Sequence, residues 1–174
     1  EQFGLDTDSL DLKAALEKIK EMEHKGFTYE GAEASVELLM RRTHPAYVPP
    51  FELIDFMVVV QRRKKRGMLA EATVKVRVGP KIIHTASEGN GPVNALDGAL
   101  RRALVDVYPR LEDARLADYK VRIIDSDNAT AATTRVLIDT VYGTNRWSTI
   151  GASSNIIEAS WLALADSMEY ALLQ

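Results

Sequence analysis

The sequence predicts an α+β fold: a short N-terminal helical linker followed by two pseudo-symmetric units of three strands and one helix. Two observations lead to this prediction. Apolar residues before position 48 recur at three- and four-residue spacing, whereas after position 50 they alternate every second residue. A shift of 61 residues also carries the expected strand 70–78 onto 131–139 and Asn94 onto Asn155. Two such units are expected to pack about a pseudo-two-fold axis.

The linker subdomain is expected to span residues 1–48 as two helices. The first has an apolar face made of residues at helical spacing, namely Leu12, Leu16, Ile19 and Met22. Asp8 or Ser9 can cap its start, and Gly26 can end it in a left-handed conformation. A second helix is expected from about Thr28 until the prolines that follow His44.

Residues 49–174 are expected to form the second domain, with repeat units at about 50–110 and 111–174. Short alternating or apolar runs predict the strands, at 51–61, 70–78, 81–87, 119–125, 133–142 and 146–149. Small residues then open a helix in each unit, at 89–92 and at 151–154.

Composition excludes several classes of function. The 174 residues include 22 Lys+Arg against 25 Asp+Glu and no cysteine. The absence of cysteine excludes disulfides and thiolate sites, and the net charge of −3 argues against a dedicated nucleic-acid binder. No apolar run approaches the roughly 20 residues that span a bilayer, and no signal peptide is recognisable. We therefore expect a cytoplasmic chain, and the start without methionine suggests a piece of a longer protein.

The two helix starts are the main candidates for binding. Glycines such as Gly89 and Gly91 let a ligand approach the backbone, and free N–H groups at a helix start attract an anion. The alternative is a pair of tight strand-to-helix turns. Asp97 and Glu158, expected in the first helical turns, either offset the helix dipole or receive an ammonium group.

Two further clusters have simpler interpretations. The basic run Arg62–Arg66 is either a phosphate or acidic-partner patch or the charged tip of a hairpin that turns at Gly67, and the tip is favoured. The run Asp125–Asn128 begins like a calcium loop, but Ala129 and Thr130 stand where a ligand and a glycine belong. A solvated turn is therefore favoured there.

Four stretches in the second domain resemble the C-terminal regulatory domain of the alpha-isopropylmalate synthase family. These stretches are Gly89–Ala95, Leu116–Val121, Thr130–Val136 and Trp147–Ile157. The segment from His24 to Arg42 is most similar to the (R)-citramalate synthase branch of that family.

The resemblance implies a function in feedback control. In the family, two βββα units form a homodimer that binds a branched-chain amino acid and inhibits a catalytic barrel of the same polypeptide. That barrel is an acyltransferase that condenses acetyl-CoA with a 2-oxo acid and carries a divalent metal. A barrel of this kind needs about 250 residues, so this chain alone is expected to be non-catalytic and to hold no cofactor.

The resemblance also assigns an effector site, carried over motif by motif. Its residues are Gly89, Gly91, Val93, Asn94, Leu116, Tyr119, Ala129, Ala131, Ala152 and Ser154, with Asp97 or Glu158 as possible ammonium partners. The expected effector is isoleucine, and leucine is the alternative. No nucleic acid or membrane partner is expected, although a stand-alone nucleic-acid-binding module that uses Arg62–Arg66 is a distant alternative.

Overall fold

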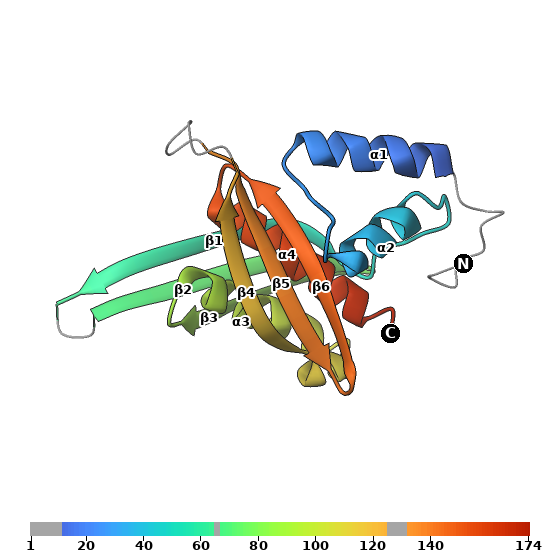
Figure 1. Ribbon diagram of the computed structural model, residues 1–174. Helices are drawn as coiled ribbons and strands as arrows, with labels where there is room; N and C mark the ends of the chain where they lie inside the picture. Colours follow the sequence, from blue (N-terminus) through green and yellow to red (C-terminus); the bar gives the residue numbers. More distant parts are fainter. Residues whose placement is uncertain (1–11, 65–66, 125–131) are drawn as a thin grey trace. The chain divides into compact units, whose positions relative to one another are not determined.

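The computed structural model describes residues 12–64, 67–124 and 132–174, with the backbone alone at Leu12 and Ala14. Its elements confirm the predicted α+β class, because three strands and one helix occur twice (Figure 1). In chain order they are α1 (Leu12–His24), α2 (Glu33–Arg42), β1 (Glu52–Arg63), β2 (Gly67–Val78), β3 (Lys81–Gly89), α3 (Pro92–Val105), the 3₁₀ helix η2 (Pro109–Asp113), β4 (Arg115–Ile123), β5 (Thr134–Tyr142), β6 (Asn145–Ser153) and α4 (Ile156–Ala171).

The chain divides into two compact units. The first unit comprises Pro50–Ala114 with Ala171–Gln174, and the second unit comprises the described residues up to Pro49 with Arg115–Tyr170. The two N-terminal helices therefore belong with the second sheet. The expected division at residues 48 and 49 into a linker subdomain and a regulatory domain stays a prediction.

In the first unit, α3 covers one face of an antiparallel sheet with the strand order β1-β2-β3 (Figure 1). The predicted alternation along β2 is confirmed, because Val74 and Val76 are fully buried and face α3 residues such as Leu100. Met57 and Ile82 lie on the opposite face of this sheet and are 57% and 58% exposed. One face of the first sheet thus forms a core with α3, while the other presents apolar side chains to solvent.

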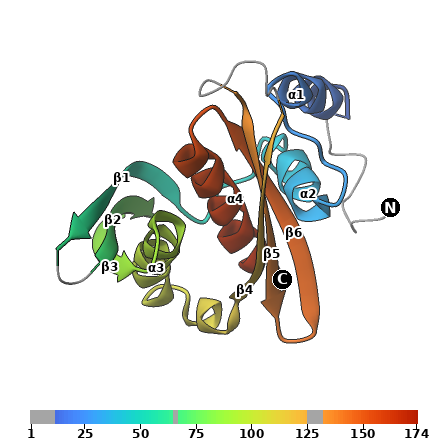
Figure 2. The ribbon, with the colours of Figure 1, turned by 60° about the vertical axis from the view of Figure 1, so that its left-hand side comes forward.

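In the second unit, α4 packs on one face of the sheet β4-β5-β6, and the N-terminal segment packs on part of the other (Figure 2). Ile138 of β5 and Leu164 of α4 are fully buried on the α4 side. On the other side the connection between α1 and α2 inserts Phe27, which packs in a cluster with Ala32, Ile150 and Ala152. The N-terminal segment therefore completes part of the core of the second unit.

Two equivalent hydrogen bonds show how the units correspond. Thr85 Oγ1 donates to the carbonyl of Ala99 at 2.7 Å, and Thr149 Oγ1 donates to the carbonyl of Ala163 at 2.8 Å. Both partners of the second bond lie 64 residues after those of the first. In each unit the third strand is thus fixed to the helix at the same point.

The predicted shift of 61 residues is therefore wrong. The shift of 61 residues aligns the identical residues Asn94 and Asn155. The strand–helix hydrogen bonds show instead that equivalent positions lie 64 residues apart. The first helical turns agree, because the Ala95 N–H donates to the Gly91 carbonyl and the Ala159 N–H donates to the Asn155 carbonyl. Gly91 of the first unit thus corresponds to Asn155 of the second.

Several predicted helix features need correction. Leu16 is 57% exposed, because α1 turns Ala15, Ile19 and Met22 inward and Leu16 lies about 100° further round the helix. The second helix begins at Glu33 rather than near Thr28. Gly31 has a φ of +74°, which a helix does not admit, so the preceding residues form a connection that supplies core side chains.

Strand ends also differ from the prediction. Strand β6 continues to Ser153 because Gly151 pairs with Val136 and Ser153 pairs with Thr134, so α4 starts only after this strand. Strand β4 begins at Arg115, four residues before the predicted start, and η2 was not predicted.

The basic run lies where a hairpin tip was expected. Arg62, Arg63 and Lys64 are exposed at the end of the β1–β2 hairpin, and Gly67 turns there with a φ of +72°. Lys65 and Arg66 fall outside the described residues, as do the caps Asp8 and Ser9 and the run Asp125–Asn128. Within the described ranges no helix is long and apolar enough to cross a membrane.

Candidate functional site

The first two predicted site residues are Gly89 and Gly91. They differ in whether the surrounding structure leaves room for a side chain. Gly89 ends β3, and a Cβ there would lie 2.5 Å from the backbone nitrogen of Ala95. Gly91 has an extended backbone with a φ of −160°, which any residue adopts, and a Cβ there would meet no described atom within 4 Å. Close strand–helix packing therefore explains Gly89, but packing does not explain Gly91.

The start of α3 lacks a side-chain cap within the described part of the chain. Pro92 occupies the first turn, and Asn94 accepts the N–H of Asn90 at 3.2 Å instead of capping the helix. The amides of this turn carry the partial positive charge of a 14-residue helix. They are suited to receive a carboxylate, with the half-buried Val93 beside them.

The start of α4 is capped by the chain itself. Asn155 Oδ1 accepts the N–H groups of Ile157 at 2.9 Å and Glu158 at 3.4 Å. Ser153 Oγ accepts the N–H of Asn155 at 3.0 Å and donates to Glu158 Oε2 at 2.5 Å. The amides that make a helix start attractive to an anion are therefore already satisfied here, next to the predicted site residue Ser154.

Leu116 and Tyr119 both lie half-buried on β4. Tyr119 points toward α4, where its hydroxyl lies 2.8 Å from Ser160 Oγ. Ser160 Oγ donates to the carbonyl of Ile156 at 2.6 Å, so the Tyr119 hydroxyl is the donor to Ser160. This hydrogen bond fixes the ring of Tyr119 against the second turn of α4.

The two predicted ammonium partners have different environments. Asp97 lies in the second turn of α3 rather than the first, and its Oδ2 accepts Arg101 Nε at 2.9 Å. Its other oxygen, Oδ1, is buried and has no partner among the described residues. Glu158 lies in the first turn of α4, as predicted, and is exposed and bound to Ser153. Of these two carboxylates, Asp97 is thus the one with an oxygen that has no hydrogen-bond partner among the described residues.

The predicted residues fall into two groups. Gly89, Gly91, Val93, Asn94 and Asp97 surround the start of α3 in the first unit. The second unit holds the remaining described ones, namely Leu116, Tyr119, Ala152, Ser154 and Glu158. Ala129 and Ala131 lie outside the described residues.

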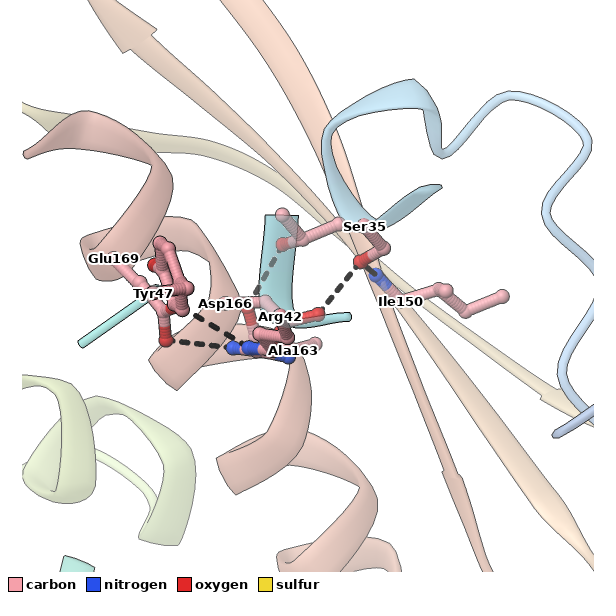
Figure 3. Close-up of polar contacts among 8 residues, drawn as sticks. Ser35, Arg42, Tyr47, Ile150, Ala163, Asp166 and Glu169 are labelled. Atoms are coloured by element: carbon pink, nitrogen blue, oxygen red, sulfur yellow. Dashed lines mark hydrogen bonds and ion pairs between the residues drawn. The ribbon is translucent and has the colours of Figure 1, made fainter. Parts of the chain in front are cut away.

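A polar network that the sequence analysis missed ties α2 to α4 (Figure 3). Arg42 Nη2 binds Asp166 Oδ1 at 2.8 Å and Glu169 Oε2 at 2.6 Å, and Arg42 Nε binds Glu169 Oε1 at 3.1 Å. The Tyr47 hydroxyl also donates to Glu169, at 2.6 Å. The signal in the sequence was the placement of Asp166 and Glu169 three residues apart on a largely apolar helix.

The same network reaches the edge of the second sheet. Ser35 Oγ donates to Asp166 Oδ2 at 2.8 Å and accepts the N–H of Ile150 at 3.0 Å (Figure 3). Ile150 lies on β6, an edge strand whose outward N–H groups have no neighbouring strand. Ser35 therefore accepts an outward N–H group of this edge strand and holds α2 against the strand.

The ionisation of this network follows from its burial and charges. Burial by itself lowers the pKa of Arg42, but Asp166 and Glu169 together raise it above its ordinary range. Burial raises the pKa of Asp166, against the opposing effects of Arg42 and Ser35. Burial and the contact with Glu169 raise the pKa of Tyr47. Arg42 therefore stays charged and Tyr47 stays protonated at neutral pH.

Comparison with known proteins gives a family for this chain. Residues 30–172 match the model of the LeuA allosteric (dimerisation) domain. The chain is 50% identical over 175 residues to the (R)-citramalate synthase of Geobacter sulfurreducens, with 99% of this chain and 33% of that protein covered. It is 45% identical to the (R)-citramalate synthase of Aquifex aeolicus, again over 99% of this chain and 33% of the relative.

A more distant relative belongs to the other branch. The 2-isopropylmalate synthase of Aquifex aeolicus is 28% identical over 180 residues, covering 100% of this chain and 31% of that protein. The chain thus spans about a third of the length of the curated relatives it matches.

Proposed function

Because the chain belongs to the LeuA allosteric (dimerisation) domain family, we propose that it is the feedback-regulatory domain of an (R)-citramalate synthase and binds isoleucine as its inhibitor. The observation that carries this proposal is the 50% identity to an (R)-citramalate synthase, against 28% to a 2-isopropylmalate synthase. Product control by isoleucine fits the first branch, and control by leucine fits the second.

The parent protein would condense acetyl-CoA with pyruvate in a separate catalytic barrel that holds a divalent metal. A barrel of that kind takes about 250 residues, which is more than this chain contains. The chain by itself would then be non-catalytic. Release of free CoA from acetyl-CoA by the purified chain, above a boiled control, would contradict this part of the proposal.

The start of α3 supports a binding mode for a zwitterionic amino acid. The uncapped amides beyond Gly91 would receive the carboxylate. Asp97 stays the ammonium partner that the family resemblance gives, and its buried Oδ1 would have to become exposed to accept that group. Val93 offers apolar surface next to these amides. Leu116, Tyr119, Ala152 and Ser154 stay predictions from the family resemblance. Inhibition requires that the effector bind one arrangement of the parent protein better than another.

The open face of the first sheet supports a homodimer. Met57 and Ile82 are more than half exposed there, and exposed apolar surface of this kind favours association. Light scattering on the chain at tens of micromolar, on the order of the concentrations at which weak dimers assemble, is expected to give the dimer mass. A monomer under these conditions would contradict the proposal.

Titration calorimetry with isoleucine, leucine and valine tests the choice of effector. Isoleucine is expected to bind most tightly, with a modest margin, because a relocated methyl group changes binding by about 1–3 kcal/mol. Tighter binding of leucine would replace the citramalate assignment with the isopropylmalate one. If none of the three amino acids binds, the result contradicts the proposed function of this chain.

A further inference from the structure

A cavity lies on the face of the second sheet that is turned away from α4, beside the connection between α1 and α2. Its volume is about 340 Å³, within the lower range of small-molecule sites. The basic side chains of Lys120, Arg122 and Arg135 line it, and among the described residues Glu30 is the one carboxylate in the lining. None of its lining residues belongs to the predicted effector site.

The positive charges in this cavity are poorly compensated. Arg122 and Arg135 are direct partners in the β4–β5 register, and like charges at such positions destabilise a sheet. Lys120 pairs with Asp118 at 2.8 Å, whereas neither arginine has a carboxylate partner in the described ranges. Burial, and then the charge of Arg122, lower the pKa of Arg135.

Arg135 is held in place by the connection between α1 and α2. Its Nε donates to the carbonyl of Gly26 at 2.9 Å, which fixes the guanidinium and leaves its terminal N–H groups for another acceptor. Leu137 and Ile150 supply apolar surface to the cavity, and Thr28 adds a hydroxyl-bearing side chain to the lining. A planar guanidinium held in this way suits the oxygens of phosphate or carboxylate.

We propose that this cavity is a binding site for a small doubly charged oxyanion, either phosphate or a short dicarboxylate. The anion would offset the repulsion between Arg122 and Arg135. It would also hold the α1–α2 connection on the sheet, because Thr28 and Glu30 form part of the cavity lining. The proposal is independent of the amino-acid effector, since the two sites share no residue.

Thermal unfolding of the chain in increasing phosphate, succinate or acetate, at matched ionic strength, tests this site. A ligand that binds only the folded state raises the unfolding midpoint, and the midpoint keeps rising with the logarithm of the ligand concentration above the Kd. Phosphate or succinate is expected to raise the unfolding midpoint, and acetate is expected to raise it much less. The dianion that gives the larger rise shows whether the natural ligand is a phosphate or a dicarboxylate. A midpoint that rises no more with either dianion than with acetate would overturn the proposal.

Arg122→Gln is the decisive variant, because Arg122 is exposed and its side chain makes no hydrogen bond to another described residue. Its dianion affinity is expected to fall roughly tenfold, the loss typical of one charge-assisted contact. Arg115→Gln makes the same charge change at the other end of β4, away from the cavity lining, and should keep the parent response. Equal responses of Arg122→Gln and the parent would also overturn the proposal.

Discussion

The two βββα units share a hydrogen-bonding plan, but the first is open where the second is closed. Gly91 leaves the start of α3 without a side-chain cap, whereas Asn155, at the corresponding position, caps α4. The first sheet exposes Met57 on its outer face, whereas the outer face of the second sheet packs against Phe27. The start of α3 and the outer face of the first sheet are thus exposed, whereas the start of α4 and the β6 side of the second sheet are covered.

This difference assigns separate tasks to the two units. The second unit uses its filled surfaces for stability and for attachment of α2, through Ser35 and Arg42. The first unit gains no comparable stabilisation from its vacant surfaces, which leaves them available to a ligand and to a partner. Substitutions at the start of α4 and in the network between α2 and α4 should therefore affect stability, and substitutions at the start of α3 should affect effector binding.

Gly151→Ala should have the largest effect on stability. A Cβ at Gly151 would collide with the carbonyl of Ala159, so α4 would have to shift away from β6. We expect a loss of about 3 kcal/mol in the free energy of unfolding, measured with urea. Gly91→Ala is the matched control, since its Cβ enters open space and should leave stability nearly unchanged. A stable Gly151→Ala variant would contradict the close packing of the second unit.

Arg42→Gln should have the next largest effect. It leaves Asp166 and Glu169 without their cation, and Glu169 is only 4% exposed. Since Arg42 itself is partly exposed, we expect a loss of about 2 kcal/mol, below the range for a fully buried pair. Arg102→Gln, an exposed arginine of α3, is the control and should change the urea midpoint little. Equal midpoints for both variants would show that the network does not anchor α2.

Asn155→Ala should destabilise the chain by about 1 kcal/mol, because two N–H groups of α4 lose their acceptor. Asn94→Ala should have a smaller effect, since Asn94 accepts one loop N–H and does not cap α3. Chemical denaturation of both variants checks the order. The reverse order would mean that the second helix start is not the capped one.

Asp139→Asn should give the smallest effect, and one that depends on pH. Burial alone raises the pKa of Asp139, but hydrogen bonds from Ser148 and Arg146 lower it below its ordinary value of 3.8. A lowered folded-state pKa stabilises the fold above pH 3.8, and this contribution disappears as the pH falls through the folded-state pKa. The variant should be less stable than the parent by under about 1 kcal/mol at pH 7. A stability difference that grew toward low pH would contradict this sign.

Much of the fold could be predicted because local pattern and burial agree. The alternation along β2 and the small residues before α3 and α4 each indicate the element that forms. The position of Leu16 could not be predicted, because the contact of α1 with its neighbour decides which side of that helix is covered. The correspondence of 64 residues also depends on a side chain, Thr149, reaching a particular helical carbonyl.

The candidate site was less predictable than the fold. The sequence treats Gly89 and Gly91 alike, but only the packed structure shows that one is sterically required and the other is not. Asn155 before an apolar helix is a recognisable cap, and that signal was overlooked in favour of the small residues before it. The network around Arg42 joins residues more than 120 positions apart, and no local pattern reports such a contact.

Titration of isoleucine into Gly91→Val tests most directly whether the open start of α3 receives the effector. A Cβ at Gly91 meets no described atom, so circular dichroism and the unfolding midpoint should match those of the parent. The binding heat should be lost, because the valine side chain blocks approach to the amides, while Asn155→Ala should keep it. Isoleucine binding by Gly91→Val as tight as that of the parent would contradict the account.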